Sequence, residues 1–229
     1  MPACYSASVA LIAGALWKWG AVEVRGHSGE VFFLTFLGII WLIVSLHIFP
    51  WFGLCIADDV IERRNLAALI ALLGATLAVA TLYAAGNLGE GPSYWNNIFS
   101  AALGTTGFFG LWFVLELGGH VSVSIAEERD LASGVRFGGF VLAVGLILGR
   151  AVAGDWHSES ATVRDYGGPS GHFASGGAFA RTWLRGTPCQ TRTDSLAPWP
   201  GASGRGVASR PASGNRPFLS SRVACPVAS

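Results

Sequence analysis

The stretch that decides the fold is residues 61–80, IERRNLAALIALLGATLAVA, because residues 126–145, AEERDLASGVRFGGFVLAVG, repeat its pattern. In both stretches an acidic and a basic residue are followed by Asn or Asp and then by an apolar run. At an offset of about 65 residues, the matched pairs include Arg64 with Arg129, Asn65 with Asp130, and Gly74 with Gly139. This internal repeat predicts an architecture, but it names neither a substrate nor a reaction.

The composition places the chain in a membrane. Apolar residues make up 52% of the chain and charged residues only 13%, which is outside the usual range of soluble globular proteins. The formal net charge of +1 gives no basic footprint, so no nucleic-acid partner is expected. The four cysteines lack the close spacing of a zinc or redox site. No metal and no cofactor are therefore predicted.

Four apolar runs approach the roughly 20 residues that a helix needs to cross the hydrocarbon core. They cover residues 31–51, 66–86, 98–118 and 131–153. Backbone polar groups in lipid must bond within their own segment, which favours helices over any other structure. The sequence predicts an all-α, multi-pass membrane protein with four transmembrane helices.

The N-terminal segment, residues 1–30, contains a shorter apolar stretch that Lys18 interrupts. A signal-peptide core, an interfacial helix and half of a fifth span are all compatible with its length. The flanking Trp17 and Trp19 suit the headgroup layer. We therefore expect an amphipathic interfacial segment.

Orientation follows from the basic residues of the short loops. Arg63 and Arg64 separate the first two spans and Arg129 separates the last two, whereas residues 87–97 contain no Lys or Arg. The positive-inside rule then places both motif loops, residues 62–65 and 127–130, in the cytoplasm; Lys18 and Arg25 argue against this orientation. Each repeat becomes a helical hairpin, and the two hairpins, residues 31–90 and 91–156, are parallel copies.

Small residues form stripes on the two equivalent helices. The stripes contain Gly134, Gly138, Gly145 and Gly149 on the fourth span, and Ala67, Ala71, Gly74 and Ala78 on the second. Because lipid gives helices no hydrophobic reason to associate, close approach at small residues supplies the packing energy. We expect these stripes to be contact faces, the alternative being that Gly and Ala are simply common in membrane helices.

The two segments ERRNLAALIALLG and EERDLASGVRFGGFVLAVGLILGRAVAGDW together resemble a bacterial inner-membrane family catalogued as domain of unknown function 350. Members of that family look like tandem copies of this hairpin, and the resemblance covers residues 31–155. It implies an integral inner-membrane protein and brings no activity or catalytic residue with it. Asp130, where Asn is the more typical family residue, and Arg136 in the fourth span depart mildly from the pattern.

The remaining residues, 157–229, are rich in Gly, Ser, Pro and Arg and show no apolar periodicity. Such a segment cannot bury enough apolar surface to offset its ordering entropy, so a disordered tail is predicted. Because the coherent pattern stops abruptly after the sequence VRDY at residues 163–166, a frameshifted translation is a second hypothesis for this segment.

Few ionisable residues lie near the predicted spans, and each is a candidate site by default. His47, Glu116 and His120 could form a polar cluster that relays a proton or holds a cation, but we favour the simpler explanation that all three are solvated at the interface. In the motif loops, ion pairs could join Glu62 to Arg64 and Glu127 to Arg129, and Asn65 and Asp130 could be helix N-caps. The alternative is a symmetric binding site for a cytoplasmic partner. These motif-loop residues are Glu62, Arg64, Asn65, Glu127, Arg129 and Asp130.

The expected function is that of a structural or accessory membrane protein, homo-oligomeric in the lipid bilayer and without enzyme activity. A channel or carrier for a small ion or solute is the first alternative. Its path would need polar residues at mid-membrane, of which the spans offer Thr76, Thr81, Thr105 and Thr106. An intramembrane enzyme using Glu116, His120 and His47 is the second alternative, although no catalytic motif is found in its required context.

Overall fold

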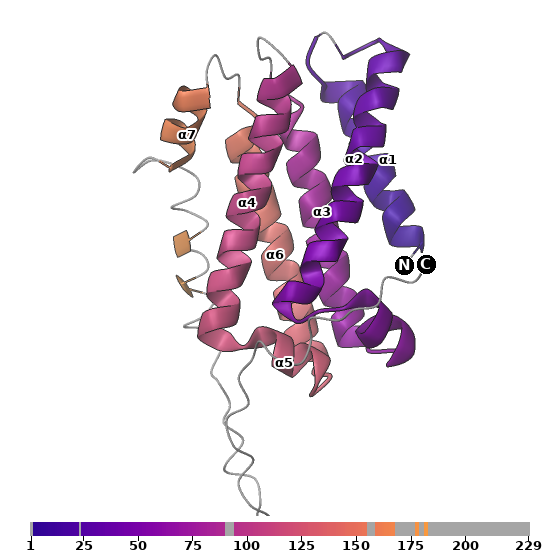
Figure 1. Ribbon diagram of the computed structural model, residues 1–229, viewed down its shortest axis with the longest axis vertical. Helices are drawn as coiled ribbons and strands as arrows, with labels where there is room; N and C mark the ends of the chain where they lie inside the picture. Colours follow the sequence, from indigo (N-terminus) through magenta and orange to yellow (C-terminus); the bar gives the residue numbers. More distant parts are fainter. Residues whose placement is uncertain are drawn as a thin grey trace, which may run out of the picture.

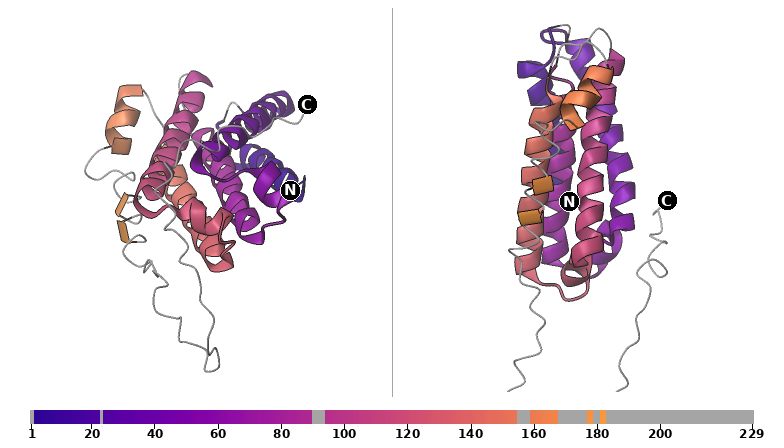
Figure 2. Two further views of the ribbon diagram at one scale, coloured as in Figure 1. Left: turned by 60° about the horizontal axis from the view of Figure 1, so that its bottom comes forward. Right: turned by 90° about the vertical axis from the view of Figure 1, so that its left-hand side faces the viewer.

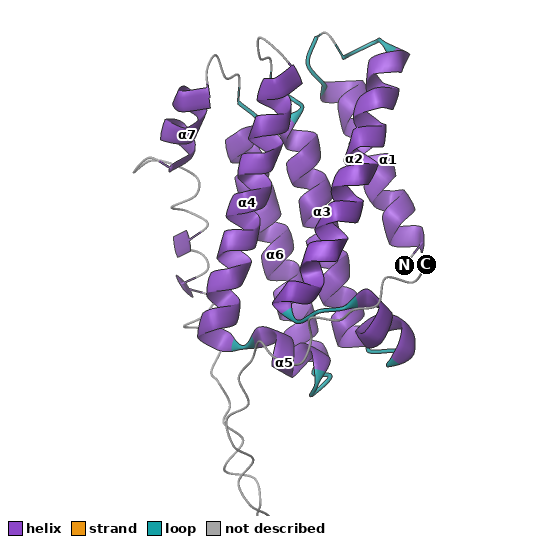
Figure 3. Cartoon of the chain, viewed as in Figure 1, coloured by secondary structure: helices purple, strands orange, loops and turns teal. Residues whose placement is uncertain are grey.

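The computed structural model describes residues 2–22, 24–89, 94–154, 159–167, 177–178 and 181–182. Within these residues every regular element is helical (Figures 1 and 3). The elements are α1 (Pro2–Trp19), α2 (Ser28–Ile48), η1 (Phe49–Phe52), η2 (Ile56–Glu62), α3 (Leu66–Gly86), α4 (Tyr94–Gly119), α5 (Val121–Ala126), α6 (Leu131–Val152) and α7 (Glu159–Gly167).

Four helices are long and apolar enough to cross a membrane, which confirms the predicted fold class. They are Ser28–Phe52, formed by α2 continued into η1, and the helices α3, α4 and α6. Helix α3 has both predicted ends, and α6 ends one residue before its predicted limit. Helix α4 begins at Tyr94, before the predicted residue 98. The chain is therefore a four-span helical membrane protein.

Helix α3 forms the centre of the bundle. It packs against α1, α2, α4 and α6 (Figure 2). About 67% of its span is buried inside the protein, compared with 28% for the span that begins with α2. Ala and Gly make up much of α3 because a central membrane helix needs small side chains for close approach on several sides.

Helices α3 and α6 approach so closely that their backbones touch at glycines. A Cβ atom added to Gly134 would lie 2.5 Å from the carbonyl oxygen of Ala67, and one added to Gly138 would lie 2.8 Å from the carbonyl oxygen of Ile70. Gly74 faces the backbone of Gly138 from the other helix. Because carbonyl groups of a neighbouring helix cannot move away, these three positions require glycine.

The contact loosens toward the other end of the pair. A Cβ at Gly145 would lie 2.6 Å from the Cβ of Ala78, whereas one at Gly149 would be at an ordinary 3.4 Å from the Cβ of Ala85. Gly139, which matches Gly74 in the repeat, would meet nothing within 4 Å. The repeat is therefore approximate in its packing: corresponding glycines have different surroundings.

Helix α1 differs from the predicted interfacial segment. It runs along α2 and α3 instead of lying across the end of the bundle (Figures 1 and 2). Ser8, Ile12 and Leu16 are fully buried at four-residue spacing, so they form a stripe on one face of the helix. That stripe packs inside the bundle, while Trp17 and Trp19 stay 58% exposed. The prediction of an interfacial segment rested on the Trp pair and Lys18 and did not include this buried stripe.

Helix α7 lies within the segment predicted to be a disordered tail from residue 157. It packs against α4 and α6, and its Tyr166 is buried. The ordered part of the chain thus extends at least to Gly167, because one aromatic side chain docks the short helix on the bundle. The rest of the predicted tail lies almost entirely outside the described residues.

Candidate functional site at the motif end of the bundle

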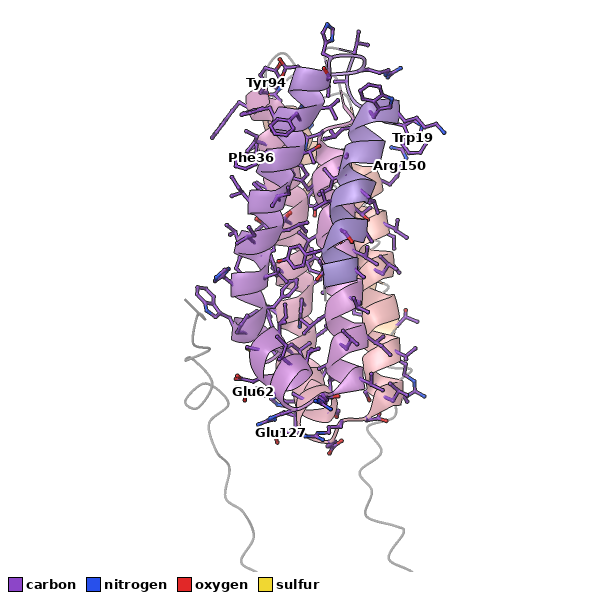
Figure 4. All side chains as sticks on the ribbon, turned by 90° about the vertical axis from the view of Figure 1, so that its right-hand side faces the viewer. Trp19, Phe36, Glu62, Tyr94, Glu127 and Arg150 are labelled. Atoms are coloured by element: carbon purple, nitrogen blue, oxygen red, sulfur yellow. The ribbon has the colours of Figure 1, made fainter. Side chains whose placement is uncertain are left out.

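Both motif loops lie at the same end of the bundle. Figure 4 shows Glu62 and Glu127 together at the lower end, and Trp19, Tyr94 and Arg150 at the upper end. We call the end that carries residues 62–65 and 127–130 the motif end. Two hairpins that enter a membrane with the same polarity require this arrangement.

Each motif loop follows a short helix that the sequence did not predict. Helix η2, a π-helix, precedes the first loop and α5 precedes the second. The same backbone hydrogen bonds close both helices at the repeat offset. They are Arg63 N to Asp58 O (3.0 Å), Asn65 N to Asp59 O (2.9 Å), Glu128 N to Val123 O (3.3 Å) and Asp130 N to Ser124 O (3.1 Å). The repeat therefore extends to individual hydrogen bonds.

An arginine in the left-handed backbone region follows each short helix and precedes each cap residue. Arg64 has a φ of 50° and Arg129 a φ of 55°, a conformation that costs a residue with a Cβ roughly 1–2 kcal/mol. The turn directs the chain from the short helix into the long one. In the first loop an ion pair joins Arg63 to Asp59, with 3.7 Å between Nη1 and Oδ1, rather than Arg64 to Glu62.

The predicted N-caps are present at the start of α3 and α6. The Asn65 Oδ1 accepts hydrogen bonds from the backbone N–H groups of Ala67 and Ala68 at 3.0 and 3.3 Å. The Asp130 carboxylate accepts from the N–H groups of Ala132 and Ser133 at 3.2 and 3.0 Å. Each cap satisfies N–H groups that the first helical turn leaves without partners.

The two caps have different surroundings. Asn65 is buried, and its Nδ2 donates a 2.7 Å hydrogen bond to the Ile125 carbonyl, which ties the first repeat to the short helix of the second. Asp130 is exposed, and hydrogen bonds from the Ser133 hydroxyl and backbone hold its pKa below the usual value. Asp, which has no amide N–H to donate, therefore stands at the exposed copy of the motif, and Asn stands at the buried copy, where its amide donates to Ile125.

Two carboxyl groups are buried at the motif end. Asp59 on η2 is fully buried, and its Oδ2 accepts a 2.9 Å hydrogen bond from the backbone N–H of Cys55. Glu116 on α4 is 3% exposed. Sequence analysis singled out Glu116 but missed Asp59, although an acidic pair at residues 58–59 directly after an apolar segment is an available signal.

Glu116 reaches across the α4–α5 turn to Ser122. Its Oε2 accepts a 3.1 Å hydrogen bond from the Ser122 backbone N–H, and its Oε1 lies 2.5 Å from the Ser122 hydroxyl. A left-handed His120, with a φ of 44°, makes the turn that allows this contact. The carboxyl thus acts as a cap for α5 from the preceding helix. No sequence pattern indicates the role of Ser122.

The three residues of the predicted polar cluster come from separate segments. Glu116 lies on α4, and His120 is exposed at the turn that follows this helix. His47 is exposed on α2, where its Nδ1 lies 2.7 Å from the carbonyl oxygen of Ile43 on the same helix. Among the described residues, no group of three or more His, Cys, Asp or Glu side chains is arranged to hold a metal ion. The Glu116 carboxyl contacts Ser122, and the His47 ring contacts its own helix.

No family model matches the chain, and no curated protein or solved structure is significantly similar to it.

Proposed function

We propose that the protein is an integral protein of the bacterial inner membrane with a structural or accessory role, homo-oligomeric and without enzyme activity. The observation that carries this proposal is that the threonine hydroxyls of the central helix α3 donate within that helix. Thr76 donates to Leu72 O at 2.7 Å and Thr81 to Leu77 O at 2.8 Å. Because these two hydroxyls already donate their hydrogens, they do not donate to a solute passing between α3 and its neighbours.

Thr105 supports the same proposal at the contact between α2 and α4. Its hydroxyl donates to Ala101 O at 2.7 Å and accepts from the Trp41 indole N–H at 3.2 Å. The hydroxyl therefore joins the first span to the third and is not directed at a water-filled path. Thr106 is exposed on the surface of the bundle. A polar path lined by the four threonines through one subunit is thus not favoured.

The family resemblance and the orientation remain parts of this proposal. The resemblance rests on the two motif segments, and the recurrence of their hydrogen bonds supports a tandem hairpin. A cytoplasmic position of the motif end rests on the positive-inside rule applied to Arg63, Arg64 and Arg129. The apolar side chains exposed on the first span face lipid or a second copy of the chain; they include Phe32, Phe33, Phe36, Ile40, Ile43 and Val44.

Flux measurements test this function directly. In liposomes that contain the purified protein, we expect proton, K⁺, Na⁺ and phosphate fluxes equal to those of empty liposomes, because the hydroxyls of Thr76, Thr81 and Thr105 already donate to carbonyl groups of their own helices. A matched preparation with the gramicidin pore shows that the assay detects flux. Protein-dependent flux of any of these ions would overturn the structural role.

A carrier of protons or small cations is the second candidate function, and the buried carboxyl of Glu116 favours it. Ionisable side chains within membrane spans are expensive and usually mark ion pathways. For this candidate, flux should be present in liposomes and should fall in the Glu116→Gln variant.

A further inference from the structure

The Glu116–Ser122 pair can hold a proton without losing its contacts. The Glu116 oxygens lie 3.1 Å from the Ser122 backbone nitrogen and 2.5 Å from its hydroxyl. A serine hydroxyl has one donor hydrogen and two acceptor lone pairs, so it can donate to a carboxylate or accept from a carboxylic acid. When a buried group gains or loses a proton, one of its hydrogen-bond partners is normally left unsatisfied, which costs free energy. In this pair the hydrogen bond between the Glu116 carboxyl and the Ser122 hydroxyl can be kept in both states.

The pair is enclosed by uncharged groups. A Cβ added to Gly53 would lie 2.6 Å from the Ser122 hydroxyl oxygen, so the turn of the first repeat covers this side chain. Gly53 has a φ of 82°, which favours glycine there. One helical turn before Glu116, the Trp112 side chain is also buried. A charged carboxyl in such surroundings depends on its hydrogen bonds.

The turn and the short helix around Ser122 contribute no ionisable side chain. Helix α5, with the sequence VSVSIA, carries none, and Gly53 contributes none. His120, at the turn between α4 and α5, is exposed to water.

We propose that Glu116 is a reversible proton-binding site in which the Ser122 hydroxyl turns from donor to acceptor when the proton binds. The proton comes from a hydronium ion of the surrounding water, an O–H bond forms on the Glu116 carboxyl, and a water molecule remains. No other covalent bond changes. The site is independent of the structural role proposed above. For the second candidate function, it identifies the transported ion as a proton.

Infrared difference spectroscopy of the full-length protein in phosphatidylcholine bilayers tests this site. As the pH falls from about 9 to about 5.5, a range that stays above the usual pKa values of exposed Asp and Glu, a C=O stretching band of a protonated carboxyl should appear. Glu116→Gln should remove this band, whereas the control Glu127→Gln, which changes an exposed carboxylate at the same end, should retain it. Ser122→Ala should keep the band but shift its frequency, because the hydroxyl partner is lost.

A difference spectrum that Glu116→Gln leaves unchanged would overturn the proposal. If that variant does not fold, Ser122→Ala carries the test, and an unshifted band has the same consequence. Because these readouts do not depend on transport or oligomer formation, their failure is distinct from failure of the proposed function.

Discussion

Gly138→Leu is expected to separate helices α3 and α6 and to prevent the protein from reaching its native fold, or to destabilise it by about 3 kcal/mol or more. A Cβ at this position would lie 2.8 Å from the Ile70 carbonyl oxygen and 3.5 Å from the Ala71 Cα. These are backbone atoms of a central helix, so they cannot move without displacing the other spans. The thermal midpoint in detergent and the yield of monodisperse protein measure the effect.

The neighbouring residue provides the matched control. Gly139→Leu adds the same side chain one position along, where a Cβ meets nothing within 4 Å. We expect a thermal midpoint at or above that of the wild-type protein, since replacing glycine in a helix gains roughly 0.5–1 kcal/mol. Equal losses in the two variants would show that α3 and α6 do not meet at Gly138.

The second large effect is expected from exchanging the two cap residues. Asn65→Asp should destabilise the protein by about 1–3 kcal/mol, because a carboxylate cannot donate to the buried Ile125 carbonyl that Asn65 now satisfies. Asp130→Asn, the reverse exchange in the other repeat, should change stability by less than about 0.5 kcal/mol, since an exposed Asn caps a helix as well as Asp. Unfolding in detergent with increasing dodecyl sulfate compares the two variants.

This comparison separates capping from the link between the repeats. Both exchanges preserve a cap, so a loss confined to Asn65→Asp measures the hydrogen bond to Ile125. If Asp130→Asn were as destabilising as Asn65→Asp, the asymmetry between the two motif loops would be wrong.

The long helices were predictable from the sequence because their signals are local. Helix α3 has its predicted ends because Asn65 caps an apolar run that stops at Gly86, before the Asn87 turn. The short helices η2 and α5 were missed because each is much shorter than a membrane span. The turn after each of them depends on an arginine, not a glycine, in the left-handed backbone region. Arginine in that conformation has no sequence signal.

The candidate site was only partly predictable because its contacts join separate elements. Glu116 was recognised as an ionisable residue near a span, but its partner Ser122 follows from the turn at His120. The buried state of Asn65 and the exposed state of Asp130 depend on the neighbours of each copy, which a repeat alone cannot indicate. Packing therefore distinguishes residues that the repeat makes equivalent.

The position of the two motif loops on one side of the membrane is the central claim, and thiol accessibility tests it most directly. In a background without the native cysteines, Arg64→Cys, Arg129→Cys and Gly29→Cys place single thiols at the two motif loops and at the opposite end of the bundle. A membrane-impermeant maleimide applied to intact cells and to inverted vesicles should label the first two thiols from one side and the third from the other. Labelling of Arg64→Cys and Arg129→Cys from opposite sides would contradict the parallel four-span arrangement.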